Sequence, residues 1–111
     1  MHSHRGSILL ANYANLLRET LILKSTVEAN QAMVSSLPDL SSALTKVVAD
    51  LFALIQDIRT TMEVLQGAKG GIVVFFLVRK EEKRYKKLVL VYNGAGEAAA
   101  EIVDMANATS R

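Results

Sequence analysis

Positive charge is concentrated in residues 79–87, which read RKEEKRYKK. Lysine and arginine side chains bind phosphate groups, and a tyrosine beside them can stack on an unpaired base. The segment therefore suggests contact with nucleic acid. The candidate contact residues are Lys80, Lys83, Arg84, Tyr85, Lys86 and Lys87. The alternative, which we favour from the sequence, is that these charges only protect the tip of a β-hairpin from aggregation.

The basic segment contrasts with the rest of the chain, because the net charge of the whole chain is only +2. Residues 69–87 contain seven basic and two acidic residues, whereas residues 1–68 contain five and six, and residues 88–111 contain one and three. Any electrostatic argument about an acidic partner therefore concerns this middle segment.

Groups suited to catalysis or metal binding are scarce. His2 and His4 are the two histidines, and they fall in residues 1–6, which we expect to be a disordered leader or a cloning remnant. Glu81 and Glu82 are adjacent, but the surrounding cations should keep both carboxylates ionised. The chain has no cysteine. We therefore predict no catalytic residue, no metal site and no cofactor, and we do not expect an enzyme.

A glycine motif at residues 94–99, GAGEAA, has the spacing of a dinucleotide-binding turn. The chain ends 12 residues after Ala99, which is too short for the returning strand and the ribose-binding acid of such a site. A plain turn between a strand and a helix is the better interpretation.

Two long helices are expected before the basic segment, at residues 7–35 and 38–66, with Ser7 as the first N-cap. Apolar residues recur at alternating gaps of four and three, which places them on one helical face. Pro38 disfavours continuation of the first helix and suits the first turn of the second. Two helices joined by so short a connection should fold back as an antiparallel hairpin.

Residues 71–92 predict a β-hairpin, because the apolar runs 72–78 and 88–92 are rich in β-branched and aromatic residues. A helix through this segment is the rival interpretation. A short helix is expected over residues 97–108 after a glycine turn. The predicted fold class is mainly α with a small β element (α+β), in one domain spanning residues 7–111.

The apolar helix faces exceed what a hairpin and one short helix can cover, and such a surplus marks an interface. We therefore predict a non-enzymatic assembly or adaptor protein, cytoplasmic, that forms a homo-oligomer or binds a protein partner. Nucleic-acid binding is the alternative, and peripheral contact with a membrane surface, without spanning it, is the third possibility. The candidate interface residues are Leu44, Leu51, Leu54, Ile58, Leu65, Phe75, Phe76 and Leu77.

Overall fold

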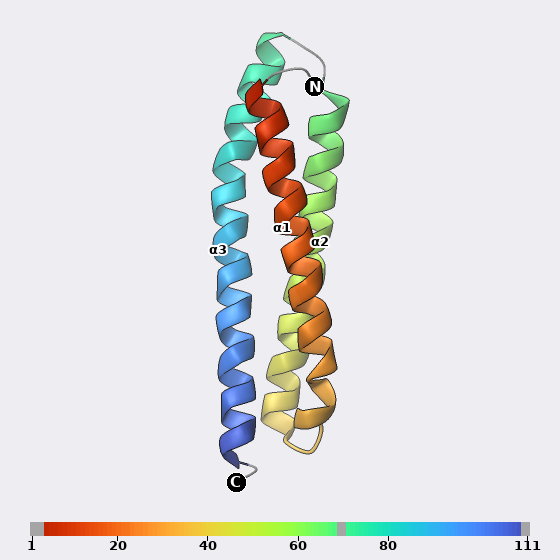
Figure 1. Cartoon of the computed structure of the whole chain (residues 1–111), viewed down its shortest axis with the longest axis vertical. Coiled ribbons are helices and arrows are strands. Elements are labelled where there is room, and N and C mark those ends of the chain that lie inside the picture. Colours follow the sequence, from red (N-terminus) through yellow and green to blue (C-terminus); the bar gives the residue numbers. More distant parts are fainter. Residues whose placement is uncertain (1–3, 69–70, 110–111) are drawn as a thin grey trace.

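In the described part of the chain, residues 4–68 and 71–109 of a computed structural model, three long helices lie side by side (Figure 1). Helix α1 spans His4–Ala29, α2 spans Pro38–Gly67 and α3 spans Ile72–Thr109, with a short 3₁₀ helix, η1, at Gln31–Val34. Helices α1 and α3 run in the same direction and α2 runs opposite to both (Figure 1). The bundle measures 60 × 17 × 17 Å along its principal axes.

The antiparallel hairpin of the first two helices is confirmed. Leu37 is extended and α2 begins at Pro38, whose missing amide hydrogen costs nothing in a first turn. The first helix differs from its predicted bounds, because α1 ends at Ala29 and the 3₁₀ helix η1 follows. It also begins at His4, so Ser7 lies inside the helix, as do residues 4–6 of the expected leader; residues 1–3 lie outside the described residues.

The predicted β-hairpin is wrong, and so is the α+β fold class. Residues 72–109 form the single helix α3, and no strand occurs in residues 4–68 or 71–109. Val74, Val78 and Glu81 are buried at gaps of four and three, and Leu88 continues the same row two turns later. The two apolar runs therefore contribute to successive turns of one inward face.

The expected glycine turn at residues 93–96 is also absent, because α3 continues through it. Gly96 faces α1, and a Cβ at this position would make an ordinary contact of 3.7 Å with Cδ2 of Leu23, so the packing does not require glycine here. Gly94 has no such contact, and a Cβ there would meet nothing within 4 Å. Gly71, in the connection before α3, has a φ of 111°, which glycine adopts without strain.

The core runs along the whole bundle and takes one face from each helix. Helix α2 is central to it, with buried apolar residues at Leu44, Val47, Leu51, Leu54, Ile55, Ile58 and Leu65. Helix α3 packs against both members of the hairpin. A long third helix therefore covers the apolar surface that the sequence pattern left without a neighbour.

Candidate binding surface on the third helix

The apolar residues predicted as an interface fall into two groups. The five on α2 face the core and are at most 3% exposed: Leu44, Leu51, Leu54, Ile58 and Leu65. Phe75 and Phe76, on α3, are exposed, and Leu77 beside them is half-buried. A partner can therefore reach the phenylalanines without opening the bundle, but not the α2 residues.

A buried polar contact ties α1 to the basic part of α3. The hydroxyl of Tyr13, which is fully buried, donates a hydrogen bond of 2.8 Å to the backbone carbonyl of Glu81. Burial raises the pKa of Tyr13 well above its usual value, and the negative charge of Glu81 raises it further. Tyr13 therefore acts as a neutral donor that links two helices.

Arg84 and Tyr85, two of the predicted nucleic-acid contacts, are engaged with neighbouring helices of the bundle. Nη2 of Arg84 lies 3.0 Å from Oδ1 of Asp57 on α2, and its Nε lies 4.0 Å from Oε2 of buried Glu81. The ring of Tyr85 packs edge-to-face on Tyr13, with centroids 5.3 Å apart. These side chains hold α3 against its neighbours, so the Tyr85 ring is not free to stack on a base.

The remaining predicted contacts are Lys80, Lys83, Lys86 and Lys87, and all four are exposed on α3. None makes an ion pair within the described residues. Beside them, the guanidinium of Arg79 lies 5.8 Å from the centre of the Phe75 ring. The first half of α3 thus combines unpaired ammonium groups with exposed aromatic rings.

An outer row of side chains runs the length of α3 on the face turned away from the core. Its members are spaced by alternating gaps of three and four, and every one is exposed. We call this set the outer row: Val73, Phe76, Lys80, Lys83, Lys87, Leu90, Gly94, Glu97, Glu101, Asp104 and Ala108. Sequence reasoning missed it, because the predicted hairpin separated its basic half from its acidic half.

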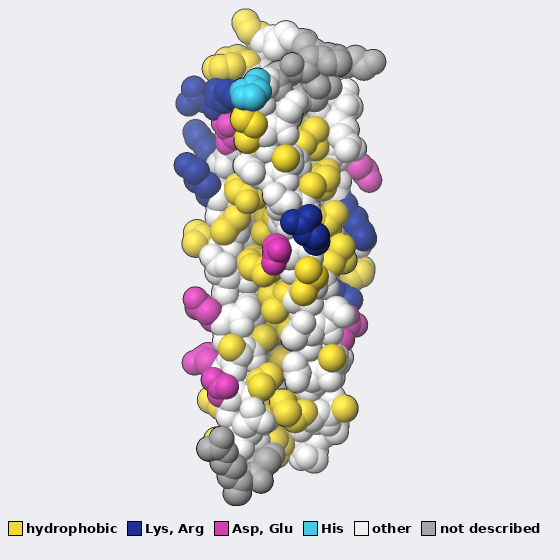
Figure 2. Space-filling view, in the orientation of Figure 1, with side chains coloured by type: hydrophobic (Ala, Val, Ile, Leu, Met, Phe, Trp, Pro, Cys, Tyr) yellow, Lys and Arg dark blue, Asp and Glu magenta, His cyan; other side chains and the backbone are white. Residues whose placement is uncertain are grey.

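The charges of α3 are separated along the helix. In Figure 2, basic side chains gather over its first half and acidic side chains appear below them, over its second half. All six basic residues of α3 lie between Arg79 and Lys87, and its last 22 residues, 88–109, contain three acidic residues and no basic one. One exposed helix therefore carries a positive segment and a negative segment.

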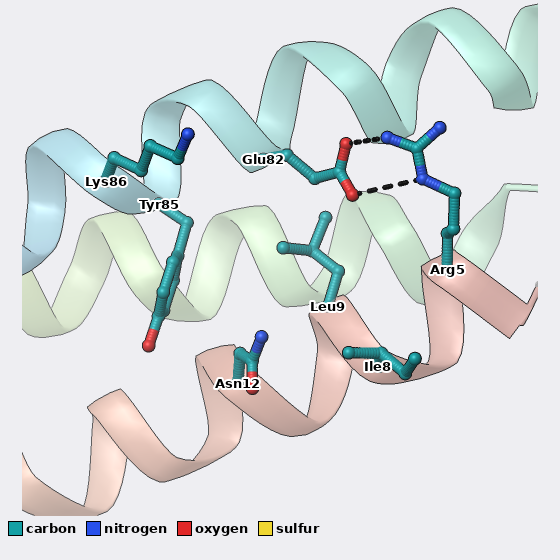
Figure 3. A pocket seen from close by; sticks show the side chains of 7 residues that line it. All are labelled: Arg5, Ile8, Leu9, Asn12, Glu82, Tyr85 and Lys86. Carbon is teal, nitrogen blue, oxygen red and sulfur yellow. Dashed lines mark hydrogen bonds and ion pairs between the residues drawn. The ribbon is translucent and has the colours of Figure 1, made fainter.

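A shallow groove of about 490 Å³ lies between α1 and α3, beside this surface (Figure 3). Arg5 and Glu82 form an ion pair at one end, and Lys86 and Tyr85 lie toward the other (Figure 3). Ile8 and Leu9 supply apolar lining between the two ends. The carboxylate in the lining of this groove, that of Glu82, is thus already paired with an arginine.

Residues 4–68 and 71–109 contain no group of three or more histidine, aspartate or glutamate side chains close enough to hold a metal ion. Within the same residues, no helix has the length and apolar character needed to cross a bilayer. No family model, curated protein or solved structure matches this chain.

Proposed function

We propose that this chain is a non-enzymatic assembly protein that self-associates through the outer row of α3. The observation that supports the proposal is the exposure of large apolar side chains on that row: Val73 is 76% exposed, Phe76 63% and Leu90 70%. Apolar side chains that share one face at spacings of three and four residues are typical of helices that pair with a partner helix, and Val73, Phe76 and Leu90 share such a face. The absence of cysteine fits a cytoplasmic location, which we propose with it.

The other exposed apolar residues support this choice of surface. The large apolar side chains exposed on α1 and α2 are scattered along those helices: Ile8, Leu21, Ile22, Phe52 and Val64. On α3 itself, Ile72, Phe75, Val91 and Met105 are also exposed beside the outer row. Isolated apolar side chains are common on protein surfaces and mark no interface. The outer row instead places its apolar residues on one face, together with charges of both signs.

Self-association is expected to depend on Leu90 and not on a comparable apolar residue elsewhere. In sedimentation equilibrium over micromolar concentrations, the unmodified chain should show a dimer in exchange with monomer. Leu90→Glu should shift the chain to monomer, because it places a carboxylate at an apolar position of the contact. Phe52→Glu, at an exposed position on α2, is the matched control and should still associate. An unmodified chain that stays monomeric throughout would contradict the proposal.

Nucleic-acid binding is a second candidate, supported by the four exposed lysines of α3 that form no ion pair with any acidic side chain in the described part of the chain. If all four neutralise phosphates, affinity for duplex DNA should fall with salt with a log–log slope of about −3 to −4. Replacing Lys80, Lys83 and Lys87 by Ala should flatten this slope and weaken all sequences alike, since phosphate contacts carry no sequence information. Undetectable binding of DNA and RNA at low salt would eliminate this candidate.

Contact with an anionic membrane surface is a third candidate. It is supported by the exposed apolar residues Ile72, Val73 and Phe76 at the start of α3, next to Arg79 and Lys80. Apolar insertion combined with basic residues is the usual mode of peripheral membrane attachment. Unlike self-association, this candidate gives no role to the acidic second half of the outer row.

A further inference from the structure

We infer that the occupant of the outer row is a second copy of this chain, with its α3 antiparallel to the first. The inference rests on the proposed self-association and adds the direction of the two helices, their register and the residues that meet. Its basis is the reversal of charge along the row. Lysines occupy three consecutive positions in the first half: Lys80, Lys83 and Lys87. Acidic residues occupy three consecutive positions in the second half: Glu97, Glu101 and Asp104.

One antiparallel register satisfies all of these charges. With the two-fold axis level with residue 92, Lys80 meets Asp104 of the second copy, Lys83 meets Glu101 and Lys87 meets Glu97. Each pair occurs twice, because the two-fold axis makes the contact identical from both chains. At the ends of the contact, Phe76 lies against Ala108, so a large side chain faces a small one.

The same register accounts for Gly94. It places Leu90, the one leucine of the row and 70% exposed, directly against Gly94 of the second copy. A glycine inside a helix costs about 1 kcal/mol relative to alanine, and nothing in residues 4–68 and 71–109 requires one here, since a Cβ at Gly94 would meet no atom within 4 Å. A close approach by Leu90 from a second copy supplies the missing reason.

Other arrangements of two α3 helices fit poorly. A parallel pair places Lys83 against Lys83 and Glu101 against Glu101, and like charges across such a seam repel. An antiparallel pair shifted toward the start of the helix places Lys87 against Leu90 and Phe76 against Glu101. The favoured register gives a contact about 48 Å long between residues 76 and 108, at 1.5 Å of rise per residue.

A charge exchange between Lys83 and Glu101 tests the register. Lys83→Glu and Glu101→Lys should each weaken self-association at least tenfold, because each places two like-charged pairs in the contact. An equimolar mixture of the two variants should associate as tightly as the unmodified chain, since every pair in the mixed dimer is again opposite. Lys86→Glu, which makes the same change of charge beside the row, is the matched control and should have little effect.

The outcomes separate this inference from the proposed function. If the unmodified chain dimerises but the mixture of variants does not recover, self-association stands and the antiparallel register is overturned. If the unmodified chain does not associate at all, both fail. Recovery in the mixture, with both variants folded by circular dichroism, supports both.

A distance measurement gives the direction of the helices independently. The chain has no cysteine, so Asn107→Cys provides a single site for a spin label on an exposed position beside the outer row. In the antiparallel dimer the two labels should be about 45 Å apart, from 15 residues on each side of the axis at 1.5 Å per residue. A parallel dimer would bring them to about 10 Å, and this result would overturn the inference.

Discussion

Leu51→Ala is expected to lower the free energy of unfolding by about 2–5 kcal/mol, the usual cost of truncating a buried leucine. Leu51 is fully buried and packs in one core cluster with residues from all three helices, including Val27, Leu44 and Ile102. Because α1 and α3 both contact α2 at this level, they cannot close the space that alanine leaves without shifting against each other. Urea denaturation followed by circular dichroism measures the loss.

The neighbouring residue provides the control. Phe52 is 55% exposed, so Phe52→Ala removes a larger side chain yet should cost well under half as much as Leu51→Ala. Leu51→Met, which keeps the volume, should cost less than about 1.5 kcal/mol. Equal losses for the two alanine variants would show that α2 does not present this face to the core.

The two N-terminal helices could be predicted from local signals. Helix α2 carries an apolar row interrupted only at Thr61, and Pro38 marks the start of the helix by chemistry that does not depend on the rest of the fold. The ends of α1 were less predictable. Asn30 lies at the break, where its side-chain amide donates a hydrogen bond of 2.9 Å to the carbonyl of Thr26. Such a contact leaves no periodic pattern in the sequence.

The third helix could not be predicted from propensity, because its ends and its middle give opposite signals. Isoleucine, valine and phenylalanine at residues 72–78 favour a strand, and burial against two helices overrides that preference. The decisive inward position is Glu81, a carboxylate in a charged run that is nevertheless 6% exposed. Its neighbour Arg84 offsets the charge, but a sequence pattern assigns both residues to solvent.

The outer row could not be predicted for the same reason, since the predicted β-hairpin hid that residues 72–109 form one helix. An apolar row predicts that Leu44 or Ile58 is buried, but it does not say whether the covering residues belong to the same chain. Once α3 extends over the full length of the hairpin, it encloses those residues and leaves its own outer face free. The pairing of Lys83 with Glu101 in a second copy can be proposed only when both lie on one helix.

Tyr13→Phe is expected to destabilise the fold by about 1–2 kcal/mol near neutral pH. It removes the hydroxyl that donates a hydrogen bond of 2.8 Å to the carbonyl of Glu81, in an interior site where water does not replace the donor. Tyr92→Phe is the matched control, because Tyr92 is only half-buried and its hydroxyl makes no hydrogen bond within residues 4–68 and 71–109. The free energy of unfolding of Tyr92→Phe should lie within about 0.5 kcal/mol of that of the unmodified chain.

The difference in free energy of unfolding between the unmodified chain and Tyr13→Phe should also depend on pH. Burial, with Glu81 nearby, raises the pKa of Tyr13 in the folded chain, whereas in the unfolded chain it titrates near its usual value of about 10. The folded state therefore holds its proton more tightly, so the stabilisation by Tyr13 is complete below pH 10 and falls as the pH rises above it. Urea denaturation of both chains from pH 8 to 11 measures this, and using the difference removes the contribution of the lysines. A difference that stays constant, or grows, above pH 10 would show that the Tyr13 hydroxyl is not held as a buried neutral donor between α1 and α3.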